Sequence, residues 1–183
     1  MPAPTGQTLT TMAVADGVAA EITTPADSTV WTEPTITVVR RWLPTPNNAD
    51  LNVVYLSVIA LGRGRRGHEQ DPGGVPKSGR FTRATIRSTH RIKVQMQTRI
   101  SSDAAVYDGP GGRIDQLAGF LSQIEDYWNV KHRQVNAIAG LTTGKTGVLL
   151  WESSIKFYEP DAAATNMLFA GEIALAFSEI TPW

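Results

Sequence analysis

The sequence predicts an α+β fold, in which a mostly antiparallel sheet of about five strands carries two main helices packed on one side. Two segments support this prediction. Residues His90 to Ile100 alternate between apolar and polar side chains, as expected of a strand with one buried face. Residues from Arg113 to about Val130 repeat apolar side chains at steps of three and four, as expected of an amphipathic helix.

Length and composition predict one folded domain over residues 1–183, with a loose N-terminal tail at 1–7. Hydrophobic residues make up 42% of the chain and charged residues 19%, which is too apolar for a disordered protein. From Thr8 onward, small apolar residues predict a helix that ends at Pro25. Gly17 weakens that helix by about 1 kcal/mol relative to alanine.

Four further strands are predicted around the alternating one. Thr35 to Leu43 lies between two prolines, and Leu51 to Leu61 is apolar on both faces, as in an interior strand. Val148 to Tyr158 and Met167 to Ile180 read as a closing hairpin. One face of the last strand is predicted to hold large apolar residues and the other face alanines, namely Phe169, Ile173, Leu175 and Phe177 against Ala170, Ala174 and Ala176.

Residues 62–88 are predicted to form a long Gly/Arg-rich loop between the second and third strands. The loop and the polar face of the strand after it are rich in basic residues, although the formal net charge of the chain is zero. We consider three readings: a solvated loop, a contact with an acidic protein surface, and a contact with DNA, the last with least support. The candidate subunit or partner interface comprises Arg63, Arg65, Arg66, Arg80, Arg83, Arg87, Arg91, Lys93, Gln95, Gln97 and Arg99.

No pattern in the sequence favours catalysis, a metal or a cofactor. The chain has no cysteine, its three histidines lack metal-ligand spacing, and no serine lies in a nucleophile elbow. Residues 139–146 satisfy a relaxed phosphate-loop pattern, but a strand and not a helix is predicted to follow them. We therefore expect a turn there, and a protein that is not an enzyme.

The N-terminus has neither the basic region nor the long apolar core of a signal peptide, and no apolar run is long enough to span a bilayer. We expect a soluble protein that is made in a cytoplasm and does not bind membranes.

Four segments, taken in order, resemble the tail terminator family of tailed bacteriophages. They are ITVVRRWLP, LNVVYLSVIALG, STHRIKVQMQTRIS with the following RIDQLAGFLSQIEDYW, and SSIKFYEPDAAATNMLFAGEIALAF. The resemblance covers roughly residues 8–180, and it depends on the ordered set because no single motif is specific. Relatives of this kind usually have a short connection where this chain has residues 62–88.

The resemblance implies a virion protein of the tail or neck, assembled in the cytoplasm of a host bacterium. It implies a homo-hexameric ring at the head-proximal end of the tail tube, where it ends tube polymerisation. The implied partners are copies of the chain, the tube protein, neck, stopper or connector proteins, and genomic DNA passing through the ring without sequence-specific binding. It implies no catalytic residues and no cofactor.

Two alternatives stay open. The chain could be another head–tail connector component, such as a stopper or tail-completion protein, because these also form rings from small domains. Less favoured is a nucleic-acid-binding module that uses the basic region at residues 62–93.

Overall fold

The computed structural model describes residues 10–25, 29–41, 52–66, 85–100, 112–131, 138, 148–157 and 167–182. Its elements follow the predicted order of helix, two strands, strand, helix and two strands. They are α1 (Thr11–Thr23), β1 (Ile36–Arg40), β2 (Val54–Arg66), β3 (Thr85–Arg99), α3 (Arg113–Lys131), β4 (Val148–Phe157) and β5 (Leu168–Pro182). The predicted α+β class is confirmed.

The five strands form one sheet in the order β1-β2-β3-β5-β4. Only β1 and β2 pair in parallel, and the other three pairings are antiparallel. β3 lies at the centre and pairs with β5 along its full length, from Thr85 opposite Pro182 to Arg99 opposite Leu168. The predicted closing hairpin is present as the antiparallel pair β4 and β5.

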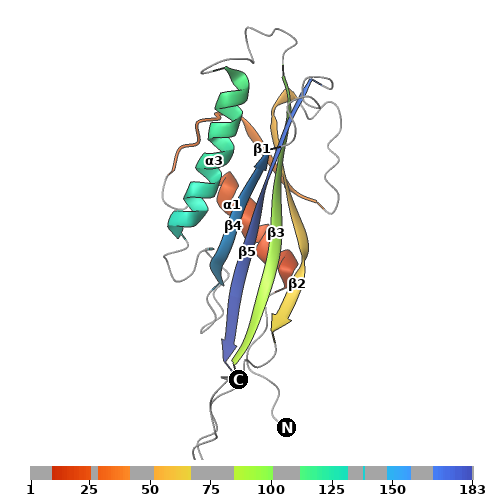
Figure 1. Cartoon of the computed structure of the whole chain (residues 1–183), viewed down its shortest axis with the longest axis vertical. Coiled ribbons are helices and arrows are strands. Elements are labelled where there is room, and N and C mark those ends of the chain that lie inside the picture. Colours follow the sequence, from red (N-terminus) through yellow and green to blue (C-terminus); the bar gives the residue numbers. More distant parts are fainter. Residues whose placement is uncertain are drawn as a thin grey trace, which may run out of the picture.

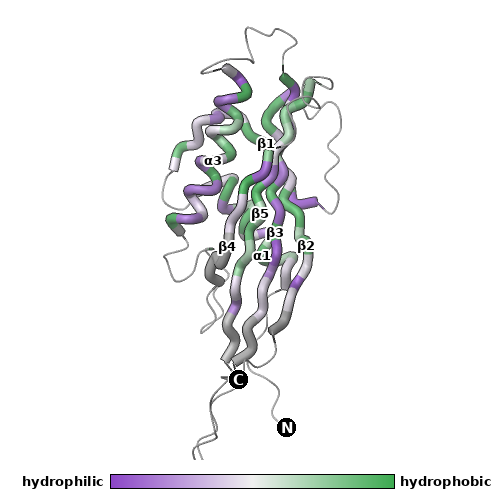
Figure 2. The backbone as a smooth tube through the Cα atoms, viewed as in Figure 1, coloured by the Kyte–Doolittle hydropathy of each residue, from purple (hydrophilic) through white to green (hydrophobic). Residues whose placement is uncertain are grey.

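The helices cover one side of this sheet, so the domain has two layers (Figure 1). α1 packs on β1, β2 and β3, and α3 packs on β4 and β5. Hydrophilic and hydrophobic residues alternate along α3 (Figure 2), as its predicted periodicity requires. The stripe predicted on α3 is at the core, with Leu117, Leu121, Ile124 and Trp128 fully buried.

Polar and aromatic contacts join the two helices and the segment between α1 and β1. The buried carboxylate of Glu21 accepts a hydrogen bond from the hydroxyl of Tyr127. The Trp31 indole Nε1 donates to the backbone carbonyl of Ile22 at 2.8 Å, and its ring lies edge-on to Tyr127 at 5.3 Å between centroids. These contacts fix α1 against α3 on the same side of the sheet.

The alternation predicted for the central strand is confirmed. Ile92, Val94 and Met96 are fully buried beneath the helices, and Thr98 lies on the same side. The intervening residues of β3 point to the opposite side, because successive strand residues alternate between faces. The sheet therefore has a buried helix side and a second face that the helices do not cover.

The bounds predicted for the loop at 62–88 are wrong at both ends, because β2 continues to Arg66 and β3 begins at Thr85. Residues 62–66 pair with residues 87–91, and residues 67–84 lie outside the described chain. The strand register shifts between Ala60 and Gly62, where Gly62 has a φ of 149°. Glycine adopts such a φ readily, and here it marks a β-bulge inside a strand, a use that composition does not distinguish from a loop.

A matched pair of glycine substitutions tests how α3 packs on β5. A Cβ at Gly171 would lie 2.7 Å from Leu121 Cδ2, which belongs to a fully buried side chain, whereas a Cβ at Gly119 on α3 meets nothing within 4 Å. We expect Gly171→Ala to lower the free energy of unfolding by about 1–3 kcal/mol. Gly119→Ala should raise it by about 0.5–1 kcal/mol, because alanine favours the helix.

Urea unfolding of both variants measures these changes, and each variant is the control for the other. Equal shifts of the same sign would contradict the close approach of α3 at Gly171.

Candidate functional site

The face of the sheet away from the helices carries a group of cations that we call the basic sheet face. Register and alternation assign Arg91, Lys93 and Arg99 of β3 and Lys156 of β4 to it. Arg41 joins them from the end of β1, with its guanidinium 5.0 Å from the centre of the Tyr55 ring. Among the side chains that the structure describes on this face, the acid is Glu172 of β5, whose Oε2 is 2.9 Å from Lys93 Nζ. Positive charge therefore predominates among the described side chains of this face.

The alanines of β5 form a low strip across the basic sheet face. Ala170, Ala174 and Ala176 lie opposite Gln97, Lys93 and Arg91. Phe169, Ile173, Leu175 and Phe177 point to the core, which confirms the predicted division of this strand. Because alanine has a short side chain, another molecule can approach the backbone closely here.

Five of the predicted interface residues share this face. Arg91 and Arg99 are exposed, Lys93 and Gln97 are half-buried, and Gln95 is only 8% exposed. The structure thus brings together the β3 residues for which the sequence predicted a common polar face.

Of the other six predicted interface residues, one lies on the helix side of the sheet and five have no described side chains. Arg63 lies on the helix side, where its guanidinium donates to Ser88 Oγ at 2.7 Å and pairs with Glu179 at 3.5 Å. The bulge before Gly62 changes the phase of β2 and turns Arg63 away from the basic sheet face. The remaining five have no described side chains: Arg65, Arg66 and Arg87 lie within β2 and β3, and Arg80 and Arg83 lie outside the described chain.

A row of polar atoms is shielded on the basic sheet face without a hydrogen-bond partner. Tyr55 lies opposite Gln97, and Ser57 lies opposite Gln95. The hydroxyl oxygens of Tyr55 and Ser57 and the Oε1 atoms of both glutamines are buried and unpaired. Each such group costs about 1–3 kcal/mol until it is bonded.

A buried polar network lies on the helix side of the sheet, around His90. His90 Nε2 is 3.1 Å from Glu179 Oε2, and His90 Nδ1 is 3.1 Å from Thr11 Oγ1. Both His90 and Glu179 are 0% exposed. Burial lowers the pKa of His90, although the hydrogen bond to Glu179 acts in the opposite direction and Arg63 in the same one.

The His90 network ties α1 to β3 and β5, and it is enclosed. A histidine between a hydroxyl and a carboxylate has the bonding order of a hydrolytic triad. Here neither the histidine nor the carboxylate reaches solvent. Arg63 further neutralises Glu179. We therefore assign this network to stability.

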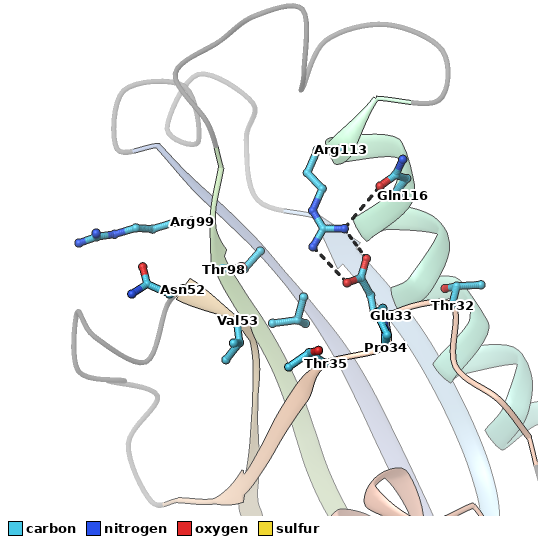
Figure 3. A pocket seen from close by; sticks show the side chains of 11 residues that line it. Thr32, Glu33, Pro34, Thr35, Asn52, Val53, Thr98, Arg99, Arg113 and Gln116 are labelled. Atoms are coloured by element: carbon cyan, nitrogen blue, oxygen red, sulfur yellow. Dashed lines mark hydrogen bonds and ion pairs between the residues drawn. The ribbon is translucent and has the colours of Figure 1, made fainter.

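A shallow polar pocket of about 600 Å³ lies where β2 begins, β3 ends and α3 begins. Arg99 and Asn52 form one side of it, and Arg113, Gln116 and Glu33 form the other (Figure 3). Arg113 Nη2 donates to Glu33 Oε2 at 3.0 Å, and a second bond joins the same two groups. This bidentate pair fixes the start of α3 against the segment before β1 and leaves Arg99 as the unpaired cation among the lining residues.

Sequence reasoning missed the partners that come from distant elements. Glu179, Glu172 and Lys156 belong to strands whose neighbours are set by the sheet order and not by the sequence order. The Arg113–Glu33 pair joins residues 80 positions apart. The strand before Gly62 is apolar on both faces, so this glycine was the available signal for the bulge that moves Arg63.

No protein-family model matches the chain, and no curated protein matches it either. None of the helices in the described residues is long and apolar enough to cross a membrane. Within the same residues, no three His, Cys, Asp or Glu side chains lie close enough together to hold a metal ion. The phosphate-loop pattern at 139–146 lies outside the described chain, and the strand predicted after it is β4.

The lowered pKa of His90 predicts a pH dependence of stability. Its folded pKa lies below the ordinary value of 6.5, so the unfolded chain binds this proton more readily. The stability contributed by neutral His90 is therefore complete above the ordinary pKa, and it is lost as the pH falls below that value. We expect the free energy of unfolding of the wild type to fall more steeply than that of His90→Gln when the pH is lowered in this window.

Denaturant titrations of both proteins in steps below neutral pH measure this difference. A reference pair at pH ~8, where the ordinary histidine is neutral, gives the cost of the substitution itself. Parallel curves for the two proteins across the whole range would rule out the titration of His90 as the cause.

Proposed function

We propose that the protein is a structural subunit of a bacteriophage tail or neck, and most specifically a tail terminator. In this role, copies form a ring, six-fold by the family resemblance, at the head-proximal end of the tail tube. The ring ends tube polymerisation and joins the tail to the neck. Its partners are other copies, the tube protein and neck or connector proteins, and genomic DNA passes through its lumen.

One structural observation carries the proposal. The domain buries one side of its sheet under two helices and leaves the other side with exposed cations, a strip of alanines and shielded, unpaired polar atoms. A subunit can place its neighbour against the exposed cations and the alanines of this face, which the helices leave uncovered. The resemblance of the ordered segments to tail terminators then supplies the kind of assembly.

The structure bears differently on the two alternative functions, another head–tail connector component and a nucleic-acid-binding module. A stopper or tail-completion protein would use the same face, and the described residues do not separate it from a terminator. A nucleic-acid-binding module would need the cations of region 62–93 on one surface. Arg63 instead pairs with buried Glu179 on the helix side, while Arg91 lies on the other side, so the described part of that region is split.

Assembly measurements test the proposed role. We expect the chain to form a ring, alone or in the presence of the tail tube protein, because the exposed cations and alanines of the uncovered sheet face offer a surface to a neighbouring copy. Native mass spectrometry and sedimentation report the subunit number, and electron microscopy reports whether tubes carry a ring at one end. Tubes grown with the protein should be shorter and closed at that end, while tubes grown without it continue to lengthen.

The nucleic-acid reading is the control arm of this experiment. Salt-dependent binding to arbitrary duplex DNA by a chain that stays monomeric, with and without tube protein, would overturn the terminator proposal in favour of that reading.

A further inference from the structure

The helix layer of the domain is acidic. α1 contains two acids, Asp16 and Glu21, and no Lys, Arg or His. Between Ile114 and Val130, α3 contains three acids and again no Lys, Arg or His. Between the terminal residues Arg113 and Lys131, the charged residues of α3 are therefore all acidic, as are those of α1.

The exposed part of this charge is concentrated on α3. Asp115 and Asp126 are exposed, and Glu125 is half-buried and accepts a hydrogen bond from Ser153. Arg113 at the start of α3 is held by Glu33. On α1, Glu21 is buried and Asp16 forms an ion pair with Arg40, so α1 contributes less.

The formal net charge of zero thus conceals a separation between two opposite sides of the molecule. The basic sheet face carries exposed Arg91 and Arg99, and the outer side of α3 carries exposed Asp115 and Asp126. The sheet and its buried core lie between them. Two copies stacked in the same direction would place these unlike charges against each other, whereas copies meeting face to face would place like charges together.

We propose that copies of this chain associate front to back, with the basic sheet face of one copy against the outer side of α3 of the next. This inference rests on the proposed function, since it names the two surfaces that form the ring. A contact between two different surfaces is heterologous, and repetition of it closes a ring when the rotation between copies permits.

The shapes of the outer side of α3 and of the basic sheet face are compatible with this contact. On α3, Gly119 lies four residues after Asp115 and seven before Asp126, which places the three on one side of the helix. A Cβ at Gly119 would meet nothing within 4 Å, so the middle of this side is low. β5 is low in the same way at Ala174 and Ala176, and the neighbouring Glu172 on this face is paired with Lys93. A helix can therefore approach the strand while charged residues meet around it.

Two charge-reversed proteins test the contact. The helix-reversed protein carries Asp115→Lys with Asp126→Lys, and the sheet-reversed protein carries Arg91→Glu with Arg99→Glu. None of the four residues supports the core, because all are exposed. Asp115→Glu with Asp126→Glu is the matched control that keeps the charge of α3, and Arg91→Lys with Arg99→Lys is the matched control that keeps the charge of the sheet.

Each reversed protein alone should associate at least about tenfold more weakly than the wild type at low salt, while both controls keep wild-type association. An equimolar mixture of the two reversed proteins should assemble again, because each then offers the charge that the other lacks and the two alternate around the ring. A chain carrying all four substitutions should assemble by itself. Sedimentation and native mass spectrometry measure association, and thermal unfolding confirms that each variant is folded.

The measurement separates the two proposals. Where the wild type assembles only with tube protein, all variants are compared in its presence. If the wild type assembles and folded reversed proteins assemble equally well, or if their mixture stays dissociated, the front-to-back contact is overturned and the ring role stands. A wild type that stays monomeric with and without tube protein overturns both.

Discussion

The one-sided burial of the central strand β3 is the constraint on which the rest of the structure depends. Ile92, Val94 and Met96 pack under the helices, and Ile173 and Leu175 of β5 continue the same layer. Since strand residues alternate between faces, a shift of one residue would turn this whole set toward solvent. The burial of one face therefore holds the register of β3 with both neighbours, and it places the basic residues of β3 together on the other face.

The bulge at Gly62 shows how one backbone feature reassigns a charged side chain. Up to Ala60 the even residues of β2 face the helices, and after the bulge Arg63 does so. Arg63 thereby reaches Glu179 and joins the His90 network inside the domain. Composition alone placed Arg63 with the other arginines of a loop, because glycine-rich runs are common in loops and the use of glycine at a bulge depends on the partner strand.

The charge distribution gives the net-neutral chain two sides of opposite sign. Among the described residues, the acids of α3 lie on one side, and the cations of β1, β3 and β4 lie on the other side together with Glu172, with the hydrophobic core between them. Part of this was predictable, since the polar residues of β3 follow from its alternation. The contributions of Lys156 and Glu172 were not, because β4 and β5 reach that face only through pairings between segments far apart in the chain.

Local patterns in the sequence by themselves determined the α+β class, the extent of α3 and the division of β3 and β5 into apolar and polar sides, because periodicity is a property of neighbouring residues. The tertiary structure alone decided the strand order, the parallel pairing of β1 with β2 and the partners of Arg63, Arg113 and Glu179. These depend on contacts between residues distant in the chain, whose energies no local pattern encodes. The same contacts decide which side of the sheet the helices leave uncovered.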